Sequence, residues 1–317
     1  MELKQLMQKF HSKILLFGEY SVIQNSMGLS IPFNQFEGML DFADLKTATE
    51  FQQASNKSLR KFYVYLRRKQ FLGELLADLN LFRLREDLKK GLFFDSNIPQ
   101  GFGVGSSGAL CAALYDLYAS NKISRDTITK EQMPELKKIF SQMESYFHGT
   151  SSGMDPLICY LNMPVLIENR SSLGTIDLPK SVMEGKGAIF LIDTGMTGKT
   201  APLVELFLDK CKQNEFIDMC RKDFIPYNDN SIRAFLKGET KNLFNNLYFL
   251  SKFLLENLSP MVPKVFQGLW KTGLDTKAFY LKLCGSGGGG FLLGFTEDYD
   301  KAKDYLKDYS VKVIHRF

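Results

Sequence analysis

Short apolar runs and segments with helical periodicity alternate along most of this chain. Runs of Leu, Ile, Val and Phe that end at Gly, Pro or polar residues predict buried strands at residues 13–18, 92–94, 163–167, 188–192, 279–283, 291–293 and 311–314. Apolar residues at helical spacing predict helices at residues 58–90 and 130–147. An Ala- and Leu-rich composition predicts a buried helix at 109–119, and further helices are expected across most of 201–272 and at 299–309. This mixture of elements predicts an α+β fold.

Two glycine-rich segments interrupt the pattern, and each comes directly after a predicted strand or loop. The first, GFGVGSSG at residues 101–108, precedes an Ala- and Leu-rich helix. Small residues let backbone N–H groups approach a phosphate, and a helix N-terminus adds about half a positive charge. The second, GSGGGG at residues 285–290, is longer than a hairpin reversal requires. The first segment therefore predicts an anion cradle, and the second predicts a place that needs bare backbone.

Two acidic residues flank a Gly/Ser loop in the middle of the chain. Glu144 lies near the end of one predicted helix and Asp155 follows eleven residues later, before Pro156. Taken singly, each could be a solvated charge or a helix cap. Together with a serine hydroxyl, one carboxylate is a suitable ligand for Mg²⁺, and the second can accept a hydroxyl proton. Lys13, at the edge of the first strand, is the cation that would accompany such a carboxylate.

Composition narrows the classes of function. A chain of 317 residues predicts about two domains, with the polar stretch 169–187 as the junction. The net charge of +5 is too dispersed to predict nucleic-acid or membrane partners. The apolar runs are too short for a membrane span or a signal peptide, which predicts a cytoplasmic protein. Five scattered cysteines and three histidines predict reduced thiols, and a hard cation on oxygen ligands rather than zinc.

Four motifs in order resemble those of the GHMP small-molecule kinases, and among these the mevalonate kinase branch most. They are KILLFGEY at residues 13–20, PQGFGVGSSG at 99–108, Glu144 followed by HGTSSGMD at 148–155, and KLCGSGGGG at 282–290. The resemblance covers nearly the whole chain. It implies an N-terminal domain like ribosomal protein S5 domain 2 over residues 1–180, which carries the ATP-binding glycine loop. It further implies a ferredoxin-like C-terminal domain over residues 181–317, which carries the second glycine-rich loop.

The resemblance also implies roles for individual residues. Asp155 would be the catalytic base toward the substrate hydroxyl with Lys13 beside it, and Ser107 and Glu144 would hold Mg²⁺. ATP would bind between the two domains, at Gly101, Gly103, Gly105, Ser106, Ser107, Gly108, Gly287 and Gly288. Acceptor binding would fall to Glu19, Tyr20, His148, Ser152, Lys199 and Thr200. The implied reaction transfers the γ-phosphoryl group of ATP to the C5 hydroxyl of mevalonate, in isoprenoid precursor synthesis. Homodimer formation stays open.

Some positions leave alternatives open. Tyr20 stands where mevalonate kinases commonly have His and phosphomevalonate kinases more often have Tyr. Gly198 replaces a common Arg, whereas Gly290 departs from the Asp typical of phosphomevalonate kinases. Phosphomevalonate or another alcohol is therefore the second acceptor hypothesis. The pattern GxGxxG at residues 103–108 also permits a nicotinamide-dependent oxidoreductase, although no acidic strand end follows it. A non-catalytic binding module of the same fold is a further alternative.

Overall fold

The computed structural model describes residues 8–169, 172–180 and 185–317. Its contacts divide the chain into two units, each assembled from separate segments. Unit 1 contains the described residues up to Lys13, together with Ile31–Pro99 and Gly105–Met163. Unit 2 contains Ile14–Ser30, Gln100–Val104 and Pro164–Phe317. Residues 181–184, at which the predicted second domain begins, lie outside the described residues, and the predicted boundary after residue 180 stays a prediction.

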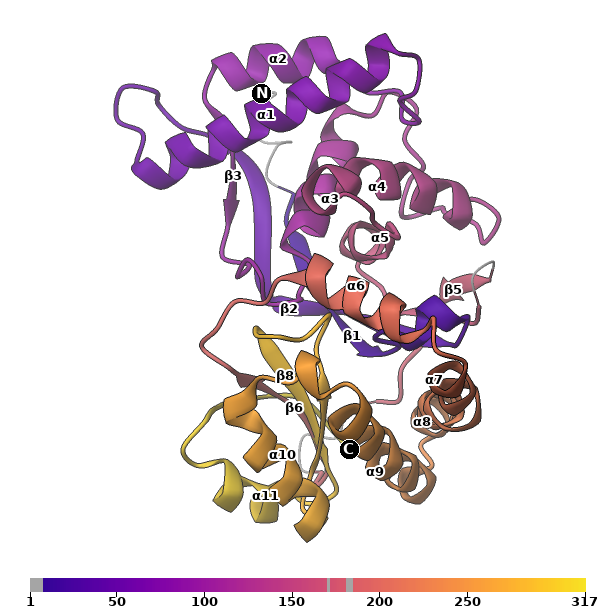
Figure 1. Ribbon diagram of the computed structural model, residues 1–317. Coiled ribbons are helices and arrows are strands. Elements are labelled where there is room, and N and C mark those ends of the chain that lie inside the picture. Colours follow the sequence, from indigo (N-terminus) through magenta and orange to yellow (C-terminus); the bar gives the residue numbers. More distant parts are fainter. Residues whose placement is uncertain (1–7, 170–171, 181–184) are drawn as a thin grey trace. The chain divides into compact units, whose positions relative to one another are not determined.

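The first sheet has five strands in the order β1-β2-β4-β5, with β3 paired to β2 (Figure 1). The strands are β1 (Phe10–Phe17), β2 (Gly28–Phe42), β3 (Leu92–Ser96), β4 (Val165–Ile167) and β5 (Leu173–Thr175). β3 runs antiparallel to β2, with Gly38 opposite Ser96. The long strand β2 was not predicted because Pro32, Gly38 and exposed polar residues interrupt its alternation. The chain passes from one unit to the other within β1 and again within β2.

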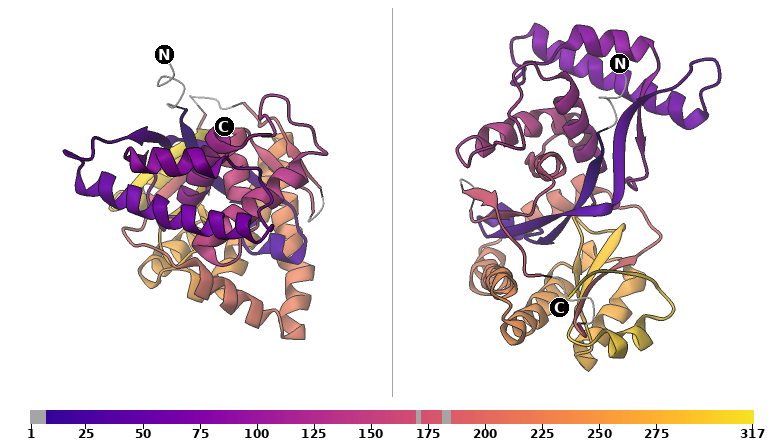
Figure 2. Two further views of the ribbon diagram at one scale, coloured as in Figure 1. Left: turned by 90° about the horizontal axis from the view of Figure 1, so that it is seen from above. Right: turned by 180° about the vertical axis from the view of Figure 1, so that it is seen from behind.

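Helices of unit 1 are α1 (Glu50–Phe71), α2 (Leu81–Lys89), α3 (Ser106–Tyr118), α4 (Met133–His148) and α5 (Met154–Leu161). α1 and α2 lie side by side in both views of Figure 2. The prediction of one helix over residues 58–90 was wrong at its centre. Gly73 adopts a φ of +67°, which ends α1, and the Asn80 side chain caps α2 by accepting from the Arg83 N–H.

The inner helices α3 and α5 form the packed centre of unit 1. Eight of the thirteen residues of α3 and seven of the eight residues of α5 are buried, and the Ala- and Leu-rich sequence of α3 predicted a buried helix. Gly108 of α3 permits their close approach, because a Cβ there would lie 2.8 Å from the Asp155 carbonyl carbon. α5 was not predicted, since its eight residues are too few for a clear period. This packing fixes the start of α5 beside the start of α3.

Unit 2 is built on a four-stranded sheet in the order β7-β8-β6-β9. Its strands are β6 (Ala188–Asp193), β7 (Tyr280–Leu283), β8 (Phe291–Thr296) and β9 (Ser310–Arg316), and each described pairing is antiparallel. The helices are α6 (Thr200–Lys210), α7 (Asn214–Met219), α8 (Ile225–Lys237), α9 (Thr240–Asn257), α10 (Lys264–Thr276) and α11 (Tyr299–Leu306). Helices α9 and α10 pack against β7 (Figure 1). The predicted strands and the largely helical stretch 201–272 are confirmed here. The helices and antiparallel sheets together confirm the α+β fold class.

No helix in the described part of the chain is both long enough and apolar enough to cross a bilayer.

Candidate active site

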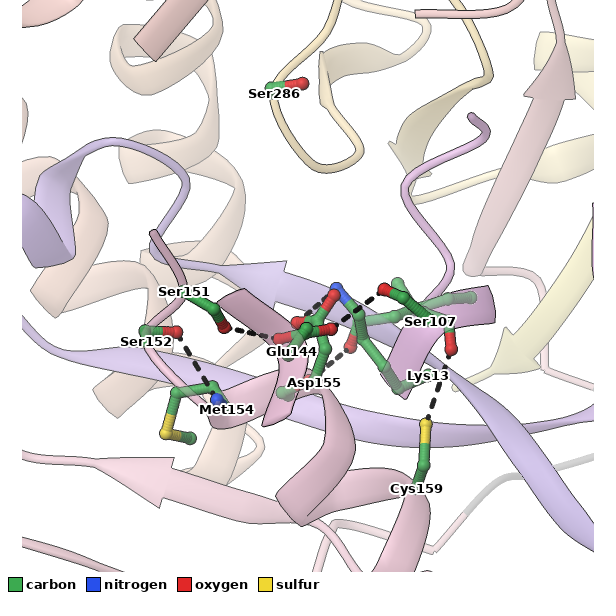
Figure 3. A network of polar contacts seen from close by, with 12 residues as sticks. Lys13, Ser107, Glu144, Ser151, Ser152, Met154, Asp155, Cys159 and Ser286 are labelled. Atoms are coloured by element: carbon green, nitrogen blue, oxygen red, sulfur yellow. Dashed lines mark hydrogen bonds and ion pairs between the residues drawn. The ribbon is translucent and has the colours of Figure 1, made fainter. Parts of the chain in front are cut away.

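A polar cluster in unit 1 brings together four of the predicted residues (Figure 3). The Lys13 Nζ lies 2.8 Å from the Asp155 Oδ1. Nearby, the Ser107 hydroxyl donates to the Glu144 Oε1 at 2.9 Å. These residues come from β1, α3, α4 and α5, so elements distant in sequence converge on one cluster. The predicted proximity of Lys13 to Asp155, and of Ser107 to Glu144, is thus present in the structure.

Asp155 and Lys13 differ in their access to solvent. The Lys13 side chain is 5% exposed and that of Asp155 is 37% exposed. The alkyl chain of Lys13 lies against Gly105, where a Cβ would come within 3.0 Å of the Lys13 Cγ. The helix α5 begins at Met154, so Asp155 is in its first turn, where a carboxylate is favoured by the helix dipole. Lys13 therefore holds a carboxylate that is still partly open to solvent.

Glu144 is the buried acid of the cluster. Its two carboxylate oxygens accept from two serine hydroxyls, Oε1 from Ser107 and Oε2 from Ser151 at 2.5 Å. Burial of the carboxylate, and then the negative charge of Asp155, raise the pKa of Glu144 to about 7. A divalent cation would supply positive charge to such a carboxylate. The oxygen-only donor set of Ser107 and Glu144 fits Mg²⁺, which prefers hard oxygen ligands.

The loop between α4 and α5 presents Ser151 and Asp155. The Ser141 hydroxyl donates to the Ser151 carbonyl at 2.6 Å, which ties this loop back to α4. Gly153 has a φ of +74°, and a Cβ there would lie 2.1 Å from the Lys137 carbonyl oxygen. Only glycine fits this close approach. Ser152, predicted to bind the acceptor, is exposed, and its hydroxyl accepts from the Met154 N–H at 3.3 Å.

His148 joins the same cluster from the last position of α4. Its Nε2 lies 3.0 Å from the Ser107 Oγ. Partial burial of the imidazole lowers the pKa of His148 below its usual value, which favours the neutral ring at pH 7. The ring therefore fixes the Ser107 hydroxyl without adding a cation. This contact to a serine, rather than to open solvent, was not predicted.

The start of α3 lies in unit 1, at the segment for which the sequence predicts an anion cradle. Gly105 is the residue before the helix and adopts a left-handed φ of +83°. The first N–H groups of any helix have no partner inside that helix. In α3 these groups belong to Ser106, Ser107 and Gly108, which were all predicted to contact the phosphates. The Cys159 thiol lies 3.8 Å from the Gly105 carbonyl oxygen and was not foreseen as part of this environment.

The other predicted residues lie in unit 2, where the two glycine segments meet. A Cβ on Gly103 would lie 2.6 Å from the Cys284 carbonyl oxygen, and one on Gly290 would lie 2.6 Å from the Phe102 Cα. The Gly198 N–H donates to the Gly101 carbonyl at 3.0 Å. The run of glycines is thus explained by backbone packed against backbone. The prediction that this place needs bare backbone has a structural cause within the protein itself.

Gly287 and Gly288 sit in that packed loop. A Cβ on Gly287 would lie 2.4 Å from the Met261 carbonyl oxygen, and the Gly288 N–H donates to the same oxygen at 2.6 Å. A phosphate contact from the Gly288 N–H would have to replace this bond. Lys199 is exposed immediately before α6. The nucleotide and acceptor contacts of these three residues stay predictions.

Glu19 and Tyr20 follow β1 in unit 2. Glu19 forms an ion pair with Lys282, and both side chains are almost fully buried. The Tyr20 hydroxyl donates to the Ser286 carbonyl at 2.5 Å. The motif quoted at residues 282–290 contains Lys282, but nothing in the sequence pattern indicated its pairing with Glu19.

The GxGxxG pattern at residues 103–108 has a different setting from a dinucleotide-binding loop. Such a loop follows a strand of a parallel sheet. The preceding strand here is β3, which is antiparallel to β2. We therefore drop the nicotinamide-dependent oxidoreductase as a hypothesis.

Comparisons with known proteins give a domain match and a shared fold. Residues 69–162 match the model of the GHMP kinases N-terminal domain. A search of curated protein sequences gave no significant match. Among solved structures, L. major mevalonate kinase in complex with R-mevalonate has a TM-score of 0.63 at 17% identity, over 96% of this chain and 94% of that one.

Two further solved structures show the same likeness. Streptococcus pneumoniae phosphomevalonate kinase in complex with phosphomevalonate and AMPPNP has a TM-score of 0.64 at 15% identity, over 97% of this chain and 99% of that one. Lactococcus lactis galactokinase complexed with galactose has a TM-score of 0.66 at 12% identity, over 98% and 94%. The fold is therefore shared along nearly the whole chain. The domain match at residues 69–162 includes Ser107, Glu144 and Asp155, so this segment matches a GHMP kinase N-terminal domain, within a chain that shares its fold with solved kinases of this family.

Proposed function

We propose that the protein transfers the γ-phosphoryl group of ATP to the C5 hydroxyl of mevalonate. The observation that carries this proposal is the cluster of Lys13, Asp155, Ser107 and Glu144 in unit 1. Phosphoryl transfer depends mainly on positioning and charge neutralisation, and this cluster supplies a base, a cation and oxygen ligands together. The family supports ATP as the phosphoryl donor.

Asp155 acts on the acceptor in this proposal. Its carboxylate accepts the proton of the attacking hydroxyl, so that the oxygen can bond to phosphorus. Its partial exposure leaves it accessible to a substrate, and Lys13 holds its Oδ1 at 2.8 Å. The buried ammonium of Lys13 also offers positive charge toward the transferring phosphoryl group.

Ser107 and Glu144 hold Mg²⁺, with Ser106, Ser107 and Gly108 presenting N–H groups to the triphosphate at the start of α3. When bound, the cation neutralises phosphate charge. Ser151 and His148 keep the two ligands in place, since each forms a hydrogen bond to one of them. Gly101 and Gly103 shape the loop that enters this segment.

The choice of mevalonate rests on the charges near the motifs. Phosphomevalonate carries a second, doubly charged group that needs several cations. Residues 99–108 and 144–155 contain no Lys or Arg, and Lys199 is the one cation in residues 194–200. Lys199 suits a single carboxylate. Solved mevalonate and phosphomevalonate kinases resemble the chain equally in fold, so this choice depends on the residues alone.

We expect mevalonate to be the better acceptor when kcat/KM is compared for mevalonate, phosphomevalonate, homoserine and galactose in an ATP-coupled assay. Lys13 is paired with Asp155 and Lys282 with Glu19, so Lys199 alone is left to bind a second anionic group of the acceptor. A tenfold preference for phosphomevalonate, about 1.4 kcal/mol of transition-state discrimination, would reassign the acceptor. The kinase assignment would survive that result.

Ser107→Ala and Glu144→Gln should each lower kcat and raise the Mg²⁺ concentration needed for half-maximal activity. Each substitution removes one oxygen ligand or its charge while leaving the volume nearly unchanged. Activity is measured across a Mg²⁺ titration, with circular dichroism as the test of folding. Ser145→Ala is the matched control, because Ser145 lies on the same helix as Glu144 and donates to the Ser141 carbonyl. Full activity of both variants with an unchanged Mg²⁺ requirement would refute the metal site.

A further inference from the structure

Ser286 is held from two sides within unit 2. Its carbonyl accepts from the Tyr20 hydroxyl at 2.5 Å, and its own hydroxyl donates to the Thr200 Oγ1 at 3.2 Å. Ser286 is the one residue of the segment 285–290 that has a side chain beyond hydrogen. Both partners belong to the set that the sequence resemblance implied for acceptor binding. In the structure they contact the second glycine loop.

A third member of that set reaches the strand that enters the loop. Glu19 pairs with Lys282 of β7, and the two side chains are 4% and 3% exposed. The Lys282 ammonium also donates to the Leu283 carbonyl at 3.0 Å and lies 5.8 Å from the centre of the Phe17 ring. Removing one partner of a buried pair leaves a buried charge, so the pair strongly favours this one arrangement. Glu19 therefore ties the end of β1 to the residues just before Gly285.

The backbone at Tyr20 is unusual in a way that fits this role. Tyr20 has a φ of +63°, a left-handed value that a bulky residue rarely adopts. The surroundings hold it there: the Ser21 N–H donates to the Glu19 carbonyl at 2.7 Å, and the Tyr20 ring lies 4.9 Å from the Phe207 ring. Strain of this kind persists only where other contacts determine the position. Here the strained conformation directs the hydroxyl to Ser286.

Tyr20 also stays a hydrogen-bond donor over the usual pH range. Burial raises the pKa of its phenol well above the ordinary value, with the charge of Glu19 adding to the effect. The Tyr20 hydroxyl therefore keeps its proton over the usual pH range and can always donate to the Ser286 carbonyl. An acceptor molecule that used this hydroxyl as its ligand would have to displace that bond.

We infer that Tyr20 and Thr200 are positioning residues for the second glycine loop, which fix Ser286 and so set nucleotide affinity rather than acceptor affinity. This inference rests on the proposed function, since it takes the loop to act on ATP. The contacts of Tyr20 and Thr200 with Ser286, on which the inference is built, all lie within unit 2. The inference assigns Tyr20 and Thr200 to the nucleotide rather than to the acceptor. Acceptor binding then depends on the other residues that the resemblance implied for it.

The test is Tyr20→Phe, which removes one hydroxyl and keeps the ring on Phe207. Hydrogen exchange of the ligand-free protein is measured by mass spectrometry on peptides that cover residues 284–291. We expect amide exchange there to accelerate about 3- to 10-fold, the effect of losing one hydrogen bond. The Kd of AMPPNP should rise by a similar factor, while the KM of the acceptor stays within about twofold. Unchanged exchange in the loop, or a raised acceptor KM with unchanged AMPPNP affinity, would overturn the inference.

Further variants test whether a change in exchange reflects the Ser286 contacts rather than a general loss of structure. Thr200→Val removes the other partner of Ser286 at an exposed position, and Thr200→Ser should restore wild-type exchange because it keeps the hydroxyl. Tyr305→Phe is the matched control, since Tyr305 is an exposed tyrosine of the same unit. The exchange measurement needs no nucleotide. A wild-type protein that binds no AMPPNP would therefore refute the proposed function and the nucleotide part of the inference, while altered exchange in Tyr20→Phe would still report the loop contacts.

Discussion

We expect Asp155→Asn to lower kcat by a factor of about 10² to 10⁴, the usual contribution of a positioned base. The amide keeps the size of the carboxylate and can still lie near Lys13, but it cannot accept the hydroxyl proton. The affinity for AMPPNP should change little, because the proposed phosphate contacts lie at the start of α3. Steady-state kinetics at saturating ATP and acceptor give kcat, and calorimetry gives the nucleotide Kd.

The control for this result is Asp300→Asn. Asp300 is also an acid in the first turn of a helix, α11, but its side chain is exposed. The Asp300→Asn substitution removes the same kind of interaction between a carboxylate and the helix dipole, worth about 0.3–1 kcal/mol. It should leave kcat unchanged. If Asp155→Asn instead abolished nucleotide binding and kept kcat at saturation, Asp155 would be a structural residue of α5.

We expect Gly290→Ala to lower the free energy of unfolding by about 2–5 kcal/mol. The left-handed φ of +72° accounts for about 1–2 kcal/mol of this loss. The remainder, about 1–3 kcal/mol, comes from the overpacked contact, since the new Cβ would lie 2.6–2.8 Å from backbone atoms of Phe102. Backbone atoms cannot move aside as a flexible side chain can. Urea denaturation followed by circular dichroism measures the change.

Gly238→Ala separates the two contributions. Gly238 has nearly the same conformation, with a φ of +70°, but no atom lies within 4 Å of the position of its Cβ. The Gly238→Ala variant should therefore lose only the free energy of unfolding that comes from the left-handed φ, about 1–2 kcal/mol. Equal losses in the two variants would mean that the contact with Phe102 has no energetic weight, and would leave the glycine run without its packing explanation.

Much of the fold follows from local patterns. The apolar runs predicted the strands of the second sheet, and the spacing of apolar residues predicted α4 to within a few residues. The patterns failed where local signals were weak. α5 is short, β2 alternates irregularly, and the break between α1 and α2 depends on a single left-handed glycine at residue 73.

The candidate site, too, could be predicted only in part. Lys13, Ser107, Glu144 and Asp155 could be selected from motif order, and the structure brings them together. The contacts around them could not be predicted, because they join residues far apart in sequence. The Tyr20 hydroxyl meets the Ser286 carbonyl across 266 residues, and no local pattern encodes a partner at that distance. The glycine run at residues 285–290 predicted a close approach of the backbone, but not that the partners would be backbone atoms such as those of Phe102.

The passage of the chain between units inside β1 has a consequence for biosynthesis. Ile14–Ser30 is synthesised well before Pro164–Phe317, the segment of unit 2 that contains most of its partners. Glu19 cannot meet Lys282 until 263 further residues have been synthesised. Until then its carboxylate must remain hydrated, because burying a charge before its counter-ion arrives is costly. Unit 2 therefore closes only after Lys282 has been synthesised, and the early strand is open to aggregation during that interval.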